Sequence, residues 1–173
     1  MKWMICALVS VMVSSAFAQD LYQVKEKDIT GKDFDMKSLK GKVVLVVNIA
    51  SQCGYTPQLE SLEAVYNKYK AKNFVVLGVP TNDFGGQTPE DDAAIKEFCS
   101  KNYNVTFPIL KKQTVVGKDK RPLYKYIGEK SPGDMKWNFE KILFNKEGKI
   151  VDRFPSKVAP FDAPVIKKIE SLL

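Results

Sequence analysis

The feature that constrains the fold most is a pair of buried-strand patterns separated by one helix pattern. Residues 43–50 form a nearly continuous run of apolar, mostly β-branched side chains, which is typical of a strand buried on both faces of a sheet. Apolar residues then recur at spacings of three and four between positions 59 and 69, which predicts an amphipathic helix. A second strand pattern follows at 74–79. Together these segments predict a βαβ unit, whose two strands lie parallel.

The following segments extend this unit. We expect a helix over 90–101, a short strand or edge piece over 107–110 and a short helix over 122–128. Two strand patterns within 141–154 flank the turn sequence Asn145-Lys146-Glu147-Gly148, which indicates a β-hairpin.

The two ends complete the pattern, with a hairpin expected within 22–34 and an amphipathic helix near 165–172. This order of elements is that of a thioredoxin-like α/β fold, in which helices flank a central mixed β-sheet. Since no linker, repeat or low-complexity stretch divides the chain, we expect residues 19–173 to form a single domain.

The first eighteen residues have the layout of a secretory signal peptide. Lys2 gives a positive start, residues 4–13 are apolar, and Ala16-Phe17-Ala18 places small residues at the −3 and −1 positions. We expect cleavage between Ala18 and Gln19, which would give a periplasmic or secreted protein. A membrane anchor is the alternative, but a span needs about 20 apolar residues and this run is shorter. We expect no transmembrane segment in the mature chain.

The chain is basic, with 27 lysine and arginine residues, 20 acidic residues and a net charge of +7. A basic chain can indicate nucleic-acid binding. Here the lysines are spread along the sequence, with only short clusters such as residues 118–121. Export would also separate the protein from most nucleic acid. We therefore expect the charge to serve solubility or attraction to anionic surfaces, with no nucleic-acid partner.

Histidine is absent from the sequence, and two cysteines, Cys53 and Cys99, follow the expected signal peptide. The absence of histidine excludes Ser–His and Cys–His nucleophile pairs and a histidine-containing zinc site. Two cysteines are also too few for a structural zinc cluster, so we expect no metal and no cofactor. A stabilising disulfide remains a simple alternative for two cysteines in an exported protein.

Cys53 lies where the first buried strand gives way to the helix, and we expect Thr56 to cap that helix and Pro57 to occupy its first turn. Backbone N–H groups at a helix start attract negative charge and so favour the thiolate, the reactive form of cysteine. An inert buried cysteine is the alternative, but the polar loop favours a reactive one. Because Thr56 stands where a disulfide exchanger would carry its second cysteine, ordinary exchange is not expected.

Three motifs resemble those of the glutathione peroxidase family. The segment Asn48-Ile49-Ala50-Ser51-Gln52-Cys53-Gly54-Tyr55-Thr56 is similar to the family's nucleophile motif, where some members carry selenocysteine. Phe84-Gly85-Gly86-Gln87 and Lys136-Trp137-Asn138-Phe139 are similar to its second and third motifs. The order and spacing of the motifs agree with the family from about Tyr22 to the C-terminus.

The resemblance implies a catalytic tetrad of Cys53, Gln87, Trp137 and Asn138. Attack of a thiolate on a peroxide bond leaves an alkoxide or hydroxide, which must be stabilised and protonated. Side-chain amides and an indole N–H are directed donors that add no titrating group, and they also stabilise a thiolate. Taken singly, each of the three donors fits an ordinary core, loop or turn role, whereas the set favours catalysis.

The chain departs from the family in its second motif, which often reads Pro-Cys-Asn-Gln-Phe but here reads Pro80-Thr81-Asn82-Asp83-Phe84. A possible extra thiol is lost, and the effect of Asp83 stays open. Cys99 matches the resolving cysteine of thioredoxin-dependent members. The segment between Leu110 and Trp137 lacks the insertion that family tetramers use for assembly, which implies a monomer.

The expected activity is reduction of hydrogen peroxide and organic hydroperoxides. Cys53 would become a sulfenic acid and condense with Cys99 to a disulfide, which a thioredoxin-like dithiol protein would reduce. Because the two cysteines start on separate elements, we expect local unfolding around Cys99. One alternative is a glutathione-dependent peroxidase in which Cys99 is not catalytic. Another is a non-enzymatic binding protein, such as a copper carrier, although the chain lacks the ligands that copper prefers.

Overall fold

The computed structural model describes residues 20–173, so the predicted signal peptide lies outside the described residues. A four-stranded sheet with the order β4-β3-β5-β6 forms its centre. Strands β3 (Val43–Ile49) and β4 (Phe74–Pro80) are parallel. Strand β5 (Lys141–Phe144) pairs antiparallel with β3, and β6 (Ile150–Phe154) pairs antiparallel with β5. The expected mixed sheet, its parallel βαβ unit and its C-terminal hairpin are therefore confirmed.

Strand β3 is buried along its whole length, as its uninterrupted apolar sequence predicts. Val43, Leu45 and Val47 belong to one hydrophobic core cluster, and Val44 and Val46 belong to the other. This alternation places a core on each face of the sheet, because successive side chains of a strand point to opposite faces.

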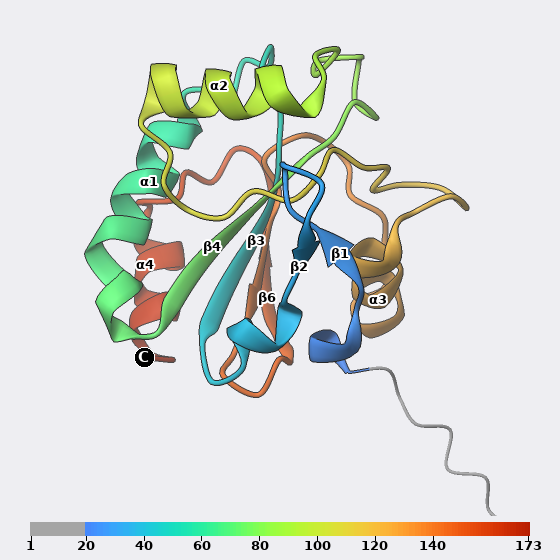
Figure 1. Ribbon diagram of the computed structural model, residues 1–173. Helices are drawn as coiled ribbons and strands as arrows, with labels where there is room; N and C mark the ends of the chain where they lie inside the picture. Colours follow the sequence, from blue (N-terminus) through green and yellow to red (C-terminus); the bar gives the residue numbers. More distant parts are fainter. Residues whose placement is uncertain (1–19) are drawn as a thin grey trace, which may run out of the picture.

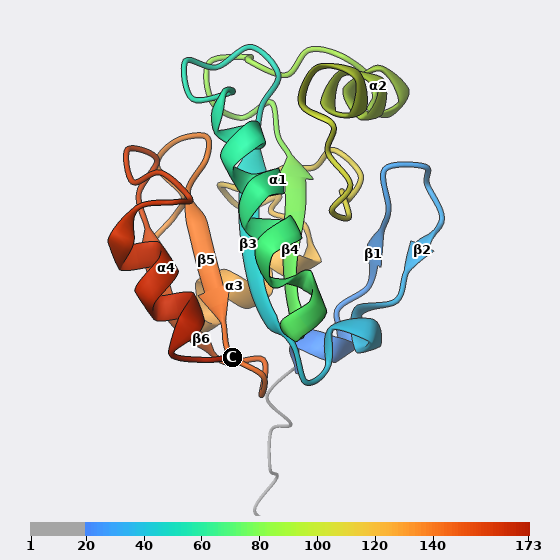
Figure 2. The ribbon, with the colours of Figure 1, turned by 90° about the vertical axis from the view of Figure 1, so that its left-hand side faces the viewer.

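Helices cover both faces of the sheet. Helices α1 (Gln58–Tyr69) and α4 (Ala163–Glu170) lie on one face, and α3 (Pro122–Lys130) lies on the other (Figures 1 and 2). Leu59, Leu62 and Val65 of α1 are fully buried at spacings of three, which confirms the helix expected from the apolar periodicity.

Helix α2 (Asp92–Tyr103) lies across one end of the sheet, at the top of Figure 1. The arrow of β4 points toward this end in Figure 2, so the carboxyl ends of the parallel strands β3 and β4 lie beneath the helix. Asp91 caps the helix through Ala94 N–H at 2.9 Å, and Asn104 ends it with a left-handed backbone at φ 51°. The expected helix is confirmed, with its bounds shifted by two residues.

Short elements complete the N-terminal half. Strands β1 (Glu26–Lys27) and β2 (Asp33–Phe34) form the expected antiparallel hairpin. Three short 3₁₀ helices are η1 (Leu21–Gln23), η2 (Met36–Leu39) and η3 (Lys70–Lys72).

The segment 107–110 forms an edge piece, one of the two forms expected for it, and not a regular strand. Ile109 and Leu110 form only isolated bridges, to Gly78 and Asp28 respectively. Pro108 has no N–H to donate to a ladder, so pairing does not extend into a regular strand. In the part of the chain from residue 20 onward, no helix combines the length and apolar character needed to cross a membrane.

Candidate active site

Cys53 lies in a tight turn that follows the carboxyl end of β3. The Thr56 hydroxyl donates to the Ala50 carbonyl oxygen and accepts from the Cys53 N–H, both at 2.9 Å. Thr56 N–H closes the turn onto the Cys53 carbonyl oxygen, also at 2.9 Å. The prediction that Thr56 caps α1 is therefore wrong, since Pro57 is the N-cap residue and makes no side-chain cap. The Thr56 hydroxyl already makes both of these hydrogen bonds within the turn that holds Cys53.

The Cys53 sulfur contacts the turn itself. Tyr55 N–H donates to the sulfur at 3.4 Å, and the cysteine is only 7% exposed. Helix α1 begins at Gln58, so the contact expected from the helix start is supplied instead by an N–H of the preceding turn. A backbone N–H aimed at sulfur stabilises a developing thiolate in either arrangement.

Gln87 lies in a loop that is bonded directly to the cysteine turn. Gly85 and Gly86 have φ values of 65° and 64°, a left-handed backbone that favours glycine. The Gln87 carbonyl oxygen accepts from Gln52 N–H at 3.0 Å and from the Ser51 hydroxyl at 3.3 Å. These contacts join the second motif to the residue immediately before Cys53.

Asn138 is fully buried and links the third motif to the second. Its side-chain amide N–H donates to Gln87 Oε1 at 3.0 Å. Gln87 Oε1 is therefore occupied, which leaves the Gln87 amide N–H group as the donor for a reacting sulfur or oxygen. Asn138 Oδ1 is buried without a hydrogen-bond partner among the described residues.

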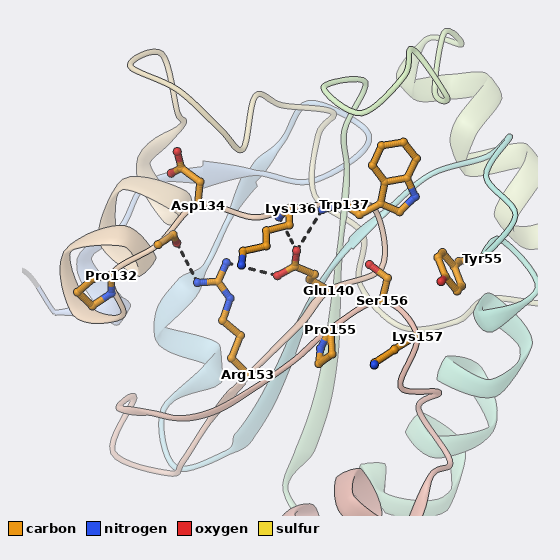
Figure 3. Close-up of a pocket in the computed structure, with 11 residues that line it drawn as sticks. Tyr55, Pro132, Asp134, Lys136, Trp137, Glu140, Arg153, Pro155, Ser156 and Lys157 are labelled. Carbon is orange, nitrogen blue, oxygen red and sulfur yellow. Dashed lines mark hydrogen bonds and ion pairs between the residues drawn. The ribbon is translucent and has the colours of Figure 1, made fainter.

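Trp137 is 39% exposed, and its ring packs on Phe84 with 5.9 Å between ring centroids. With Tyr55 of the cysteine turn it borders a cavity of about 570 Å³ (Figure 3). The lining residues are Tyr55, Pro132, Gly133, Asp134, Lys136, Trp137, Glu140, Arg153, Pro155, Ser156 and Lys157. The exposed indole thus lies between the buried Asn138 and an open cavity.

Asn48 and Asp83 have positions that the sequence analysis did not assign. Asn48 is fully buried, and its amide N–H donates to the Trp137 carbonyl oxygen at 2.8 Å. A polar residue inside an otherwise apolar strand was the available signal for such a bond. Asp83 Oδ2 accepts from Val115 N–H at 2.6 Å, so this departure from the family motif ties the Gln87 loop to the segment before α3.

Cys99 is a free thiol on α2 and is 2% exposed. Burial raises its pKa to about 12, so the thiol is protonated and unreactive while the helix stays packed. Cys53 is also free, and the two cysteines are not joined. The structure therefore bonds Gln87 to the cysteine turn and Asn138 to Gln87, and it places Trp137 on the same cavity as Tyr55. The side chain of Cys99, in contrast, is buried beneath α2.

Comparison with known proteins identifies the relatives of this chain. The Glutathione peroxidase family profile matches residues 21–128. The chain is 46% identical over 155 residues to the glutathione peroxidase-like peroxiredoxin GPX5 of Chlamydomonas reinhardtii, covering 87% of this chain and 96% of that protein. It is 40% identical over 163 residues to the hydroperoxy fatty acid reductase gpx1 of a Synechocystis species, covering 88% and 95%.

Solved structures agree with these relatives. The apo crystal structure of Trgpx is 37% identical and superposes with a TM-score of 0.72, covering 89% of this chain and 95% of that one. A thioredoxin-family thiol:disulfide interchange protein from Chlorobium tepidum shares the fold at 17% identity, with a TM-score of 0.65 and coverage of 86% and 91%. The fold is thioredoxin-like, as expected. The chain belongs to the glutathione peroxidase family and is a thiol peroxidase, an oxidoreductase that acts on hydroperoxides.

Proposed function

We propose that this peroxidase is exported and works through a two-cysteine cycle in which Cys53 attacks the peroxide and Cys99 resolves it. The observation that carries the site assignment is the hydrogen-bond chain from Gln52 through Gln87 to Asn138. This chain joins all three sequence motifs, since Trp137 adjoins Asn138. It leaves the Gln87 amide N–H group as a donor on a residue that is bonded to the cysteine turn.

In the first step the Cys53 thiolate attacks one oxygen of the peroxide. A sulfur–oxygen bond forms as the oxygen–oxygen bond breaks, so the sulfur is oxidised to a sulfenic acid and the peroxide is reduced. The departing oxygen leaves as hydroxide or alkoxide and takes up a proton, giving water or an alcohol. The Gln87 amide and the Trp137 indole N–H are the donors that stabilise this departing charge.

In the second step Cys99 attacks the sulfenic sulfur of Cys53. A disulfide forms, and the sulfenic oxygen leaves as water. Because burial holds the Cys99 pKa at about 12, this step requires α2 to open and return the thiol to water. A dithiol then reduces the disulfide and restores both thiols.

A thioredoxin-like dithiol protein is the proposed reductant. This choice is supported by the second cysteine at position 99 and by the peroxiredoxin name of the Chlamydomonas relative. Glutathione is the alternative, and Cys99 would then have no catalytic role. Hydrogen peroxide and organic hydroperoxides are the proposed substrates. The cavity of about 570 Å³ beside Trp137 has room for an organic group, and the Synechocystis relative is named for a fatty acid hydroperoxide.

The proposed test is peroxide consumption with a thioredoxin system and, separately, with glutathione, for wild type, Cys53→Ser and Cys99→Ser. Turnover with thioredoxin that requires both cysteines supports the two-cysteine cycle. Turnover with glutathione that requires only Cys53 would replace it by the glutathione-dependent alternative. If both variants keep full activity, the two-cysteine cycle and the glutathione-dependent alternative are both ruled out.

Export and a monomeric state are also proposed, on the signal-peptide layout of residues 1–18 and on the short segment between Leu110 and Trp137. N-terminal sequencing of the protein from its native host should begin at Gln19. Sedimentation of that material should give the mass of one chain. An uncleaved Met1 start, or a tetramer mass, would contradict the respective proposal.

A further inference from the structure

The carboxylate of Glu140 is buried beneath the Trp137 turn. It is 6% exposed, and its Oε1 atom accepts from the backbone N–H groups of Lys136 and Trp137, the latter at 3.1 Å. Figure 3 shows both contacts converging on the one carboxylate. Two consecutive backbone N–H groups are therefore held by a single charged acceptor, a strong form of hydrogen bonding.

Arg153 of β6 contacts both Glu140 and the residues that precede the Trp137 turn. Its Nη2 atom lies 3.4 Å from Glu140 Oε2, and the same atom lies 3.2 Å from the Met135 sulfur. Its Nη1 atom donates to the Gly133 carbonyl oxygen at 2.8 Å. The Glu140–Arg153 pair thus holds the segment that leads into Trp137 at several points.

Asn48 of β3 holds the same turn from the opposite side. Its Oδ1 atom accepts from Glu140 N–H at 3.0 Å, while its amide N–H donates to the Trp137 carbonyl oxygen at 2.8 Å. Phe139 N–H donates to the Asn48 carbonyl oxygen at 2.6 Å, and Phe139 has a left-handed backbone at φ 63°. Residues other than glycine rarely adopt that backbone conformation, so the surrounding contacts must maintain it.

Both polar groups of the Trp137 backbone are therefore fixed by side chains, the N–H by Glu140 and the carbonyl by Asn48. We propose that Glu140 is a positioning residue for the peroxidase reaction, which fixes the Trp137 indole and the Asn138 amide at the cysteine turn. This inference rests on the proposed roles of Trp137 and Asn138. Glu140 acts through the turn rather than on the reacting atoms, and small displacements of such groups cost large factors in rate.

The direct test is the single-turnover rate of Cys53 oxidation by hydrogen peroxide. Glu140→Leu removes the acceptor for both N–H groups and should slow this step by about 10- to 100-fold. Glu140→Gln keeps a neutral acceptor of the same length and should stay within about fivefold of wild type. Should Glu140→Leu not fold, Glu140→Asp tests the same point, since its charge is kept and its reach shortened. We expect it to be slower than Glu140→Gln.

A second readout reports on position directly. The chain contains two tryptophans, Trp3 and Trp137, so the full chain with Trp3→Phe has Trp137 as its sole tryptophan. In that background Glu140→Leu should give faster local motion in the decay of fluorescence anisotropy and stronger quenching by acrylamide. Glu140→Gln should remain close to the parent protein.

Glu26→Leu is the matched control. Glu26 is 7% exposed, and its carboxylate accepts from Leu123 N–H at 2.9 Å and from the Gln113 amide at 3.2 Å. Its removal should lower the melting temperature but leave both the oxidation rate and the Trp137 fluorescence unchanged. An equal loss of rate in this control would mean that general destabilisation explains the Glu140 result and would overturn the proposal.

Trp137→Phe separates this inference from the function on which it rests. If Trp137→Phe slows oxidation while Glu140→Leu, or Glu140→Asp in its place, reacts at the wild-type rate, the positioning role is wrong and the site assignment stands. If Trp137→Phe itself reacts at the wild-type rate, the proposed role of Trp137 fails first.

Discussion

Among single residues, Gln87 has the most specific arrangement at the site, because Asn138 occupies its amide oxygen and leaves its amide N–H group as the available donor. Removing one such donor from a site of this kind typically costs about 10²- to 10³-fold in rate. We therefore expect Gln87→Ala to slow oxidation of Cys53 by hydrogen peroxide by about that factor, measured in single-turnover experiments.

Gln113→Ala is the control for this prediction. Gln113 is also buried and hydrogen-bonded, to Glu26 and to the Lys111 carbonyl oxygen, but it belongs to neither the cysteine turn nor its partners. The rate of Cys53 oxidation in Gln113→Ala should match that of wild type. A Gln87→Ala variant that reacts as fast as Gln113→Ala would remove Gln87 from the proposed tetrad.

Lys141 is a fully buried lysine whose ammonium group donates to Gln58 Oε1 and to the Val158 carbonyl oxygen, both at 2.5 Å. Burial lowers its pKa from 10.5 to about 8, although the charges of Asp162 and Glu140 oppose this shift. Between these two pKa values the unfolded chain holds a proton that the folded chain has lost. Stability from this group therefore rises with pH across that window.

Lys141→Met lacks this titration. We expect the stability of wild type relative to Lys141→Met to increase between pH 8 and pH 10.5, by up to about 3 kcal/mol. Below pH 8 the full cost of burying the charge is present. Denaturant unfolding of both proteins from pH 7 to pH 10 measures the difference, and parallel stability curves would contradict a lowered Lys141 pKa.

The sequence predicted which segments meet at the candidate site better than it predicted the residues that support them. Cys53, Gln87, Trp137 and Asn138 were identified because their motifs resemble a known family, and the structure places their segments in contact. Glu140 and Lys141 carried no such signal, since a charged residue at a strand end ordinarily faces solvent. Their burial depends on partners that only the folded chain brings near, Arg153 for Glu140 and Gln58 for Lys141.

At the scale of elements, α2 determines whether Cys99 can react. Of this helix Ile95 and Cys99 are buried, and Phe98 and Tyr103 pack partly buried against the same core, so its opening exposes the apolar surface of four side chains. Loss of an N-cap costs about 1 kcal/mol, which is about a fivefold change in an opening equilibrium. We therefore expect Asp91→Ala to speed disulfide formation about fivefold without changing the oxidation of Cys53, as followed by quenched-flow mass spectrometry.

The matched control is Asp35→Ala, which removes the cap that Asp35 gives to Lys37 N–H at 3.0 Å in η2. Disulfide formation should keep its wild-type rate in this variant. If Asp91→Ala is no faster than Asp35→Ala, opening of α2 does not limit the second step.

Element prediction succeeded where periodicity alone decides the structure. The buried runs of β3 and β4 and the apolar spacing of α1 each predicted an element whose ends lie within one residue of the observed bounds. The apolar pattern of 107–110 left a strand and an edge piece open, and the edge piece forms because Pro108 cannot donate to a ladder. Thr56 failed as a cap because its hydroxyl oxygen accepts instead from a competing donor, the Cys53 N–H, which comes within reach only in the folded turn.

At the scale of the whole molecule, the site depends on bringing together three segments that are far apart in the sequence. The parallel pair β3 and β4 places residues 50–56 and 81–89 at one end of the sheet, where both strands finish. Strand β5 runs antiparallel to β3, so the residues that precede it, 136–140, lie at the same end. Hydrophobic patterning predicts this topology, but the bonds of Asn138 to Gln87 and of Asn48 to the Trp137 carbonyl follow from details of loop geometry that no pattern contains.

The most direct test of the two-cysteine cycle is disulfide mapping of the chain from Gln19 to Leu173 after one equivalent of hydrogen peroxide. The account predicts a single Cys53–Cys99 linkage in wild type, and in Cys99→Ser a sulfenic acid on Cys53 that dimedone traps. A product in which Cys99 remains a free thiol while Cys53 is oxidised, or in which neither cysteine reacts, would contradict it.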